Sequence, residues 1–180
     1  MEILRILITG SVGVGKTTMI RTISDLEVVE TEKKATDETA SIKETTTVAL
    51  DFGRLIFAPN QALHLYGTPG QARFDFMWEI LFRRTEAVIL LVDAHSPDSF
   101  PYSLQILEFI KNIKQVPMLI GVTHTDSPEA VSLNEIEKAL GFTDNFSIPK
   151  IIPVNPNDKA SVTEALLMLV EELMKTPLEE

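Results

Sequence analysis

Apolar and polar residues alternate along the chain in blocks whose spacing predicts strands and helices in turn. Nearly continuous apolar runs, typical of strands buried on both faces, cover residues 3–9, 87–92, 118–122 and 151–154. Apolar residues at helical spacing predict helices over residues 16–23, 71–84, 99–114, 133–140 and 160–175. Residues 48–58 and 62–66 surround the turn residues Pro59 and Asn60, and they predict a hairpin.

The order of these elements predicts an α/β fold. Strands that alternate with helices form a mostly parallel sheet with helices on both faces, and the hairpin adds one antiparallel pair near its edge. We expect six strands in a three-layer arrangement, within a single domain that spans all 180 residues. Residues 27–46 are mostly polar, and a loop of this length in a compact domain is either functional or disordered.

Charge and composition exclude several classes of function. The 26 acidic and 16 basic residues give a net charge of −10, which repels nucleic acids and anionic lipids. The chain has no cysteine, which excludes disulfides, thiolate metal sites and lipid anchors on cysteine. No apolar stretch approaches the ~20 residues of a membrane-spanning helix, and no targeting signal precedes the first strand. We therefore expect a cytoplasmic protein without a nucleic-acid partner or a direct membrane anchor.

Residues 10–17 read GSVGVGKT and fit the phosphate-binding pattern G-x-x-x-x-G-K-S/T between a strand and a helix. The glycines let backbone N–H groups turn toward phosphate, and the N-terminus of the following helix adds positive charge. We expect Lys16 to reach the β- and γ-phosphates and the Thr17 hydroxyl to bind Mg²⁺. The expected nucleotide-binding residues of this segment are Gly10, Ser11, Val12, Gly13, Val14, Gly15, Lys16, Thr17 and Thr18. The motif predicts a nucleoside triphosphate site but chooses neither the base nor the reaction.

Later segments resemble the Ras-like small GTPases, in their order and spacing, over nearly the whole chain. The resemblance implies the three-layer fold of P-loop nucleotide hydrolases, with switch I at about residues 27–47 and switch II at about residues 67–84. Thr47 resembles the switch I threonine that ligates Mg²⁺ and senses the γ-phosphate, with Thr45 and Thr46 as alternatives.

Residues 67–71 read GTPGQ and resemble the switch II signature D-x-x-G-Q. The resemblance implies that Gly70 donates its backbone N–H to the γ-phosphate and that Gln71 orients the attacking water. Gly67 stands where the signature has an aspartate, and a glycine cannot accept a hydrogen bond from Mg²⁺-bound water. Metal affinity or hydrolysis is therefore in question. Asp93, at the end of an apolar strand, is either a substitute Walker B carboxylate or a loop-capping residue.

Two further segments resemble the guanine-binding loops of the same family. Residues 123–126 read THTD and resemble N/T-K-x-D, whose carboxylate accepts from guanine N1–H and N2, so Asp126 is expected to choose GTP over ATP. His124 replaces the lysine, and it either stacks on the nucleotide or is an ordinary loop residue. Pro156 has no N–H, so donation to guanine O6 would fall to the Asn157 backbone. The expected base-site residues are Thr123, His124, Asp126, Asn155, Pro156 and Asn157.

The helix predicted over residues 71–84 carries an unusually broad apolar surface. Phe74, Trp78 and Phe82 share one face, and three arginines flank the segment. Such a set fits either a core-facing helix or a docking surface for a protein. We expect effectors or activators to bind switch I and residues 74–82.

These features together predict a small GTP-binding protein that uses GTP/GDP and Mg²⁺, hydrolyses GTP slowly and switches protein partners. Within the superfamily, the TPGQ segment preceded by Gly67 is similar to prokaryotic gliding-motility and conservon-type GTP-binding proteins. That resemblance implies roadblock/longin-type partners. Two alternatives stay open, a GTP-dependent binding module with little or no hydrolysis and a small P-loop ATPase or kinase.

Overall fold

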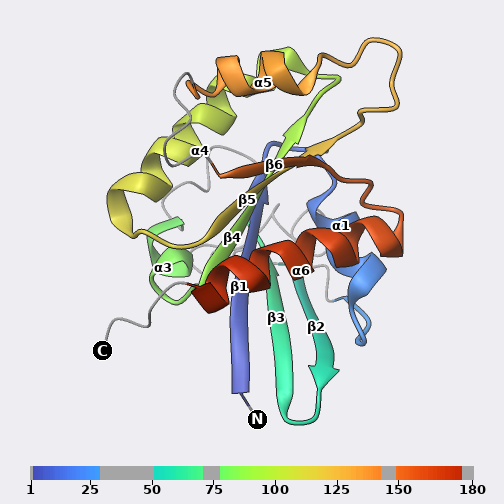
Figure 1. The fold of residues 1–180 in the computed structure, drawn as a ribbon, viewed down its shortest axis with the longest axis vertical. Coiled ribbons are helices and arrows are strands. Elements are labelled where there is room, and N and C mark those ends of the chain that lie inside the picture. The colour runs from blue at the N-terminus through green and yellow to red at the C-terminus, as the bar shows by residue number, and fades with distance from the viewer. Residues whose placement is uncertain (1, 29–50, 71–77, 143–148, 176–180) are drawn as a thin grey trace, which may run out of the picture.

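The computed structural model describes residues 2–28, 51–70, 78–142 and 149–175, and its centre is a six-stranded sheet (Figure 1). The strands lie in the order β2-β3-β1-β4-β5-β6. Their bounds are β1 Glu2–Gly10, β2 Asp51–Ala58, β3 Gln61–Gly67, β4 Ala87–Asp93, β5 Met118–Thr123 and β6 Lys150–Pro153. β2 is antiparallel to β3 and the other pairs are parallel, which confirms the predicted α/β fold.

Helices cover both faces of this sheet and complete the three layers. The helices of the described residues are α1 Lys16–Ile23, α3 Trp78–Arg83, α4 Phe100–Ile113, α5 Leu133–Ala139 and α6 Lys159–Lys175, with the 3-10 turn η2 Pro97–Ser99. Helices α1 and α6 share a buried cluster with one face of the sheet, and in Figure 1 α6 crosses in front of the strands. Helices α3, α4 and α5 share a second cluster with the opposite face.

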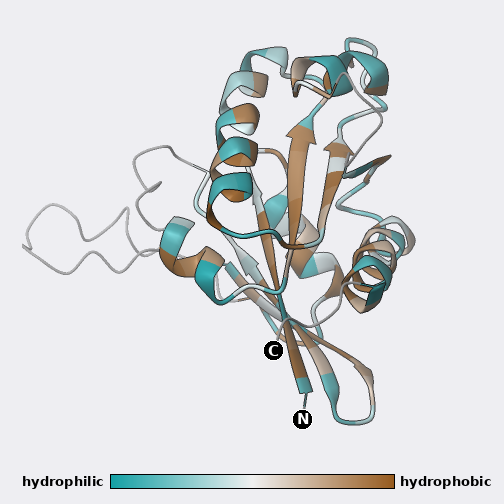
Figure 2. Ribbon diagram, turned by 60° about the vertical axis from the view of Figure 1, so that its left-hand side comes forward, coloured by the Kyte–Doolittle hydropathy of each residue, from teal (hydrophilic) through white to brown (hydrophobic). Residues whose placement is uncertain are grey.

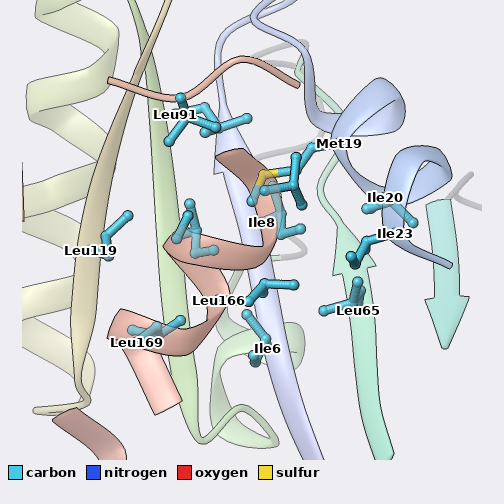
Figure 3. Close-up of a cluster of buried hydrophobic side chains, with 14 of the residues drawn as sticks. Ile6, Ile8, Met19, Ile20, Ile23, Leu65, Leu91, Leu119, Leu166 and Leu169 are labelled. Carbon is cyan, nitrogen blue, oxygen red and sulfur yellow. The ribbon is translucent and has the colours of Figure 1, made fainter. Parts of the chain in front are cut away.

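The core explains why the strands are apolar at almost every position. Ile6 and Ile8 of β1 belong to the cluster with α1 and α6 (Figure 3), whereas Leu7 belongs to the cluster on the other face. Because successive side chains of a strand point to opposite faces, a strand covered on both sides needs a continuous apolar run. The same holds for β4, whose seven residues are all buried, and Figure 2 shows the apolar character of the central strands.

One edge of the sheet gathers the chain segments that carry the predicted motifs. The parallel strands all end at this edge, so the loops that follow β1, β3, β4, β5 and β6 lie along it. β2 runs in the opposite direction, which places its first residue, Asp51, at the same edge. The register pairs Asp51 with Gly67, the last residue of β3.

The observed elements match the predicted ones closely, within the described residues. α6 begins at Lys159 and β1 reaches Gly10, one residue beyond each prediction. The helix predicted over residues 71–84 is described from Trp78 onward, and switch I from residue 29 to 47 lies outside the described residues. Throughout the part of the chain that the structure covers, no helix combines the length and the apolar character needed to cross a bilayer.

Candidate nucleotide-binding site

The loop between β1 and α1 has a backbone shape that requires glycine at its end. Gly15 forms the N-terminal boundary of α1 with a φ of 111°, a conformation that side chains of L-residues rarely adopt. A Cβ atom at Gly15 would also lie 2.7 Å from the Cγ atom of Pro156. The phosphate-binding pattern thus places its last glycine where the backbone of the loop meets the segment after β6.

Lys16 lies beneath this loop and is only 7% exposed. Its Nζ atom donates to the carbonyl oxygen of Gly10 at 2.8 Å and to that of Ser11 at 2.6 Å. A buried ammonium group needs such acceptors. Phosphate oxygens carry negative charge and are stronger acceptors than peptide carbonyls. The lysine is therefore held where an anion bound in the loop would meet it.

The segment after β3 packs directly on the phosphate-binding loop. The Thr68 backbone N–H donates to the Ile8 carbonyl oxygen at 3.0 Å, and the Thr68 hydroxyl donates to the Thr9 hydroxyl at 2.9 Å. These bonds fix the start of the predicted switch II segment against β1. A Cβ atom at Gly70 would lie 2.8 Å from the Lys16 Nζ atom, so Gly70 touches the predicted phosphate site.

A pocket of about 200 Å³ lies between these segments. Its lining residues are Val12, Gly13, Gly15, Lys16, Thr17, Thr18, Asp51, Thr68 and Gly70. The sequence predicted all of these as nucleotide-binding residues except Asp51 and Thr68. The structure therefore brings most of the predicted phosphate site together.

Asp51 is, with Thr68, one of the two pocket residues that sequence reasoning missed. The residue is 9% exposed, and its carboxylate accepts a hydrogen bond from the Thr17 hydroxyl through Oδ2. The two residues are 34 positions apart, on β2 and α1, so no motif of fixed spacing links them. The available signal was the register of the hairpin, which sets Asp51 opposite Gly67. Carboxylate and hydroxyl oxygens are ligands that Mg²⁺ prefers, so Asp51 and Thr17 fit that ion.

The predicted base-binding loop follows β5 and is braced from β4. Thr123 is buried, whereas Asp126 is exposed. The imidazole Nδ1 atom of His124 lies 2.9 Å from Oδ1 of Asp93, and the same carboxylate oxygen accepts from the His95 backbone N–H at 2.9 Å. Asp93 therefore caps the loops at the predicted base end of the site. This arrangement favours the loop-capping alternative for Asp93, while Asp51 is the carboxylate that contacts Thr17.

The loop after β6 joins the base end to the phosphate end. Pro156 is buried, and its carbonyl oxygen accepts from the Thr22 hydroxyl of α1 at 2.6 Å. The Asn155 backbone N–H donates to the Ser161 hydroxyl oxygen at 2.9 Å. The backbone N–H of Asn157, which we expected to reach guanine O6, donates to Oδ1 of Asn155 at 3.0 Å. In this structure that N–H group is used within its own loop.

Comparison with known proteins identifies the family. The sequence matches the profile of the ADP-ribosylation factor family over residues 1–173. The chain belongs to this family of Ras-like small GTPases. It is similar to an uncharacterized protein of Methanocaldococcus jannaschii, with 28% identity over 148 residues that cover 82% of each chain.

Two further relatives carry names of their own. The ADP-ribosylation factor-like protein 1 of Saccharomyces cerevisiae is 26% identical over 144 residues, which cover 78% of this chain and 71% of the relative. The mutual gliding-motility protein MglA of Myxococcus xanthus is 25% identical over 154 residues, covering 79% and 76%. The predicted resemblance to Ras-like small GTPases is confirmed, and a gliding-motility protein is among the relatives.

As a member of this family, the chain is a small GTP-binding protein. Parts of both predicted switches lie outside the described residues. Thr47, with its alternatives Thr45 and Thr46, and Gln71 belong to those parts, and their roles stay predictions. In the described part of switch II, Trp78 and Phe82 are buried in the core at 5% and 1% exposure. Ile80, on the other side of α3, is 63% exposed. The Trp78 and Phe82 positions are therefore core, and Ile80 is the apolar residue left on the surface of α3.

Proposed function

We propose that this small GTPase binds GTP and GDP together with Mg²⁺ and acts as a nucleotide-dependent switch for protein partners. The observation that carries the proposal is the convergence of Lys16, Thr17 and Gly70 on one pocket. A cation, a hydroxyl group and a closely approaching backbone are the groups that a triphosphate needs. Membership of the ADP-ribosylation factor family supports the same function.

At the phosphate end, Lys16 would transfer its hydrogen bonds from the Gly10 and Ser11 carbonyls to the β- and γ-phosphates. The Thr17 hydroxyl would hold Mg²⁺, and Thr47 of switch I would complete the protein ligands, as the family resemblance implies. When bound, Mg²⁺ neutralises negative charge on the β- and γ-phosphates. Closure of switch I on the γ-phosphate would then distinguish the GTP form from the GDP form.

At the base end, Asp126 would accept from guanine N1–H and from the N2 amino group. Adenine does not present that pair of donors, so this carboxylate would give the preference for GTP over ATP. Thr123 and His124 lie on the same loop, and Asn155, Pro156 and Asn157 form the neighbouring loop. The packing of Pro156 on Gly15 supports a single site that spans both ends.

For hydrolysis, Gln71 would orient a water molecule for in-line attack on the γ-phosphate, while Lys16 and the Gly70 backbone N–H stabilise the developing charge. We expect this reaction to be slow in the isolated protein, because activating partners of such GTPases supply rate factors of up to about 10⁵. The alternative, a binding module with little hydrolysis, differs in this step alone.

For partners, we propose protein effectors or activators that dock on switch I and on the segment of residues 74–82. Exposed Ile80 together with exposed Arg83 and Arg84 supports a protein contact near α3. We further propose partners of the roadblock/longin type, which the resemblance to gliding-motility GTP-binding proteins implies.

Single-turnover release of phosphate from bound GTP tests the hydrolysis. We expect slow release in the presence of Mg²⁺, and a further decrease of at least about ten-fold in Gln71→Leu with GDP affinity unchanged, because the glutamine acts on the attacking water. Gln61→Leu is the matched control, since Gln61 lies on β3 with its side chain bonded to Glu2. Tight GTP binding with no release from the wild type, alone or with an activating partner, would contradict hydrolysis and favour the binding module.

A further inference from the structure

An aspartate that is expected on β3 lies on the neighbouring strand β2, at the predicted phosphate end of the site. The switch II signature calls for an aspartate at the end of β3, and this chain has Gly67 there. Asp51, at the start of β2, pairs directly with Gly67 in the antiparallel register. The carboxylate that β3 lacks is therefore present one strand away, at the same edge of the sheet.

The two positions compete for the same space. A Cβ atom at Gly67 would lie 3.1 Å from the Cβ atom of Asp51, 3.3 Å from its Oδ2 atom and 2.9 Å from the Cδ1 atom of Ile20. Contacts this close are tighter than side chains normally make, so a side chain at position 67 would push against the Asp51 side chain and the end of Ile20. The glycine on β3 thus leaves the space that the aspartate side chain on β2 occupies.

The contact that Asp51 makes is the one that metal binding requires. A threonine hydroxyl that binds a cation offers an oxygen lone pair to the metal, so its proton must point to another acceptor. Oδ2 of Asp51 accepts that proton from Thr17. Asp51 is nearly buried, and its negative charge lies beside the residue expected to hold the cation. Groups that orient a metal ligand in this way strengthen metal binding.

We propose that Asp51 is the Mg²⁺-positioning residue of this GTPase, that it replaces the aspartate missing from switch II, and that Gly67 leaves room for it. The proposal rests on the proposed function, because it assumes that Mg²⁺ and a guanine nucleotide bind at this pocket. On this proposal the glycine at position 67 does not lower the affinity of the protein for Mg²⁺, because Asp51 supplies the carboxylate. Asp93 does not serve this role, since its carboxylate is bonded to His95 and lies against His124.

The test measures how much free Mg²⁺ the protein needs to retain a fluorescent GDP analogue. Asp51→Asn keeps the shape of the side chain and removes its charge. We expect the half-maximal Mg²⁺ concentration to rise about 10- to 100-fold, the range found when a group that orients a metal ligand is lost. GDP affinity in excess chelator should stay within about three-fold of the wild type, because Asp51 acts through the ion.

Two further variants make the result specific. Asp25→Asn is the matched control, because Asp25 also bonds to β2, through the Ile56 backbone N–H, but lies away from the pocket. It should leave the Mg²⁺ requirement unchanged. The exchange variant Asp51→Gly with Gly67→Asp returns the carboxylate to β3 and removes the Asp51 side chain from the space around it, so that only the flexible end of Ile20 has to shift. We expect it to recover most of the Mg²⁺ affinity lost in Asp51→Asn.

Each outcome has a distinct meaning. An unchanged Mg²⁺ requirement in Asp51→Asn would overturn the role of Asp51 and leave the proposed function intact. An equal loss of GDP affinity with and without Mg²⁺ would also overturn it, because the residue would then act on the fold alone. Failure of the exchange variant, when circular dichroism shows it folded, would overturn the replacement of one position by the other. Absence of guanine nucleotide binding in the wild type would overturn the proposed function and this inference with it.

Discussion

His124 stands where the guanine-binding signature has a lysine, and a carboxylate holds its ring in place. Its backbone has a φ of 55°, a left-handed conformation in which histidine is more common than most residues. The Nδ1 atom lies 2.9 Å from Oδ1 of Asp93. We expect the imidazole to stack on the nucleotide, and the contact with Asp93 fixes the orientation of the ring, so Asp93 should influence nucleotide affinity through His124.

Asp93→Asn should therefore weaken GDP binding about five-fold, the equivalent of one hydrogen bond worth about 1 kcal/mol. Titration with GDP measures the effect. In a His124→Ala background the same change should alter affinity less than about two-fold, because the group that Asp93 orients is absent. Asp98→Asn, in the exposed turn η2, is the charge-matched control. An equal loss in both backgrounds would show that Asp93 supports the fold rather than the ring.

Among single residues, those in contiguous motifs could be predicted and those in long-range pairs could not. Lys16, Thr17 and Gly70 were predicted because each belongs to a short pattern whose spacing follows from the geometry of the loop. Asp51 belongs to no such pattern, since its partner lies on another element. The neighbouring glycine that makes room for it looked like a defect of the motif until the register was known.

The β2–β3 hairpin sets a histidine between two cations. Arg54 of β2 and Arg5 of β1 are the register partners of His64 on β3. Burial lowers the pKa of the His64 imidazole below its ordinary value of 6.5, and the two guanidinium groups lower that pKa further. Between the lowered pKa and 6.5, the unfolded chain therefore binds more protons than the folded chain.

This difference predicts a pH dependence of stability. The contribution of His64 is fully present above pH 6.5 and is lost as the pH falls through its lowered pKa. Between about pH 7.5 and about pH 5.5, the free energy of unfolding should fall more steeply for the wild type than for His64→Gln. Denaturant titrations across this range measure both slopes. His95→Gln, at an exposed position after β4, serves as control; identical slopes for wild type and His64→Gln would rule the effect out.

Whole elements were easier to predict than their arrangement. The apolar runs of β1, β4 and β5 follow from burial on both faces, which a sequence displays directly. The strand order depends on contacts between distant segments, and the pairing of Asp51 with Gly67 depends on the register of the hairpin; periodicity encodes neither. For α3, the apolar pattern alone left core and docking roles open, and only the packing of Trp78 and Phe82 assigned them to the core.

At the scale of the molecule, one edge of a six-stranded sheet collects every described segment of the site. The phosphate end is built by the loop after β1, by the start of β2 and by the segment after β3. The predicted base end consists of the loops after β5 and β6, with Asp93 of β4 as a brace. Pro156 lies against Gly15, and its carbonyl oxygen accepts a hydrogen bond from the Thr22 hydroxyl; these contacts link the two ends. The central claim is that this continuous edge binds a guanine nucleotide.

Competition between GTP and ATP for the site, at fixed free Mg²⁺, tests this claim most directly. We expect GTP to bind at least about 100-fold more tightly than ATP, since two hydrogen bonds to a charged carboxylate are worth about 3 kcal/mol. Asp126→Asn should lose this preference and gain affinity for xanthosine triphosphate, whereas Asp98→Asn should keep it. Binding of ATP as tight as that of GTP, or tighter, would contradict the account.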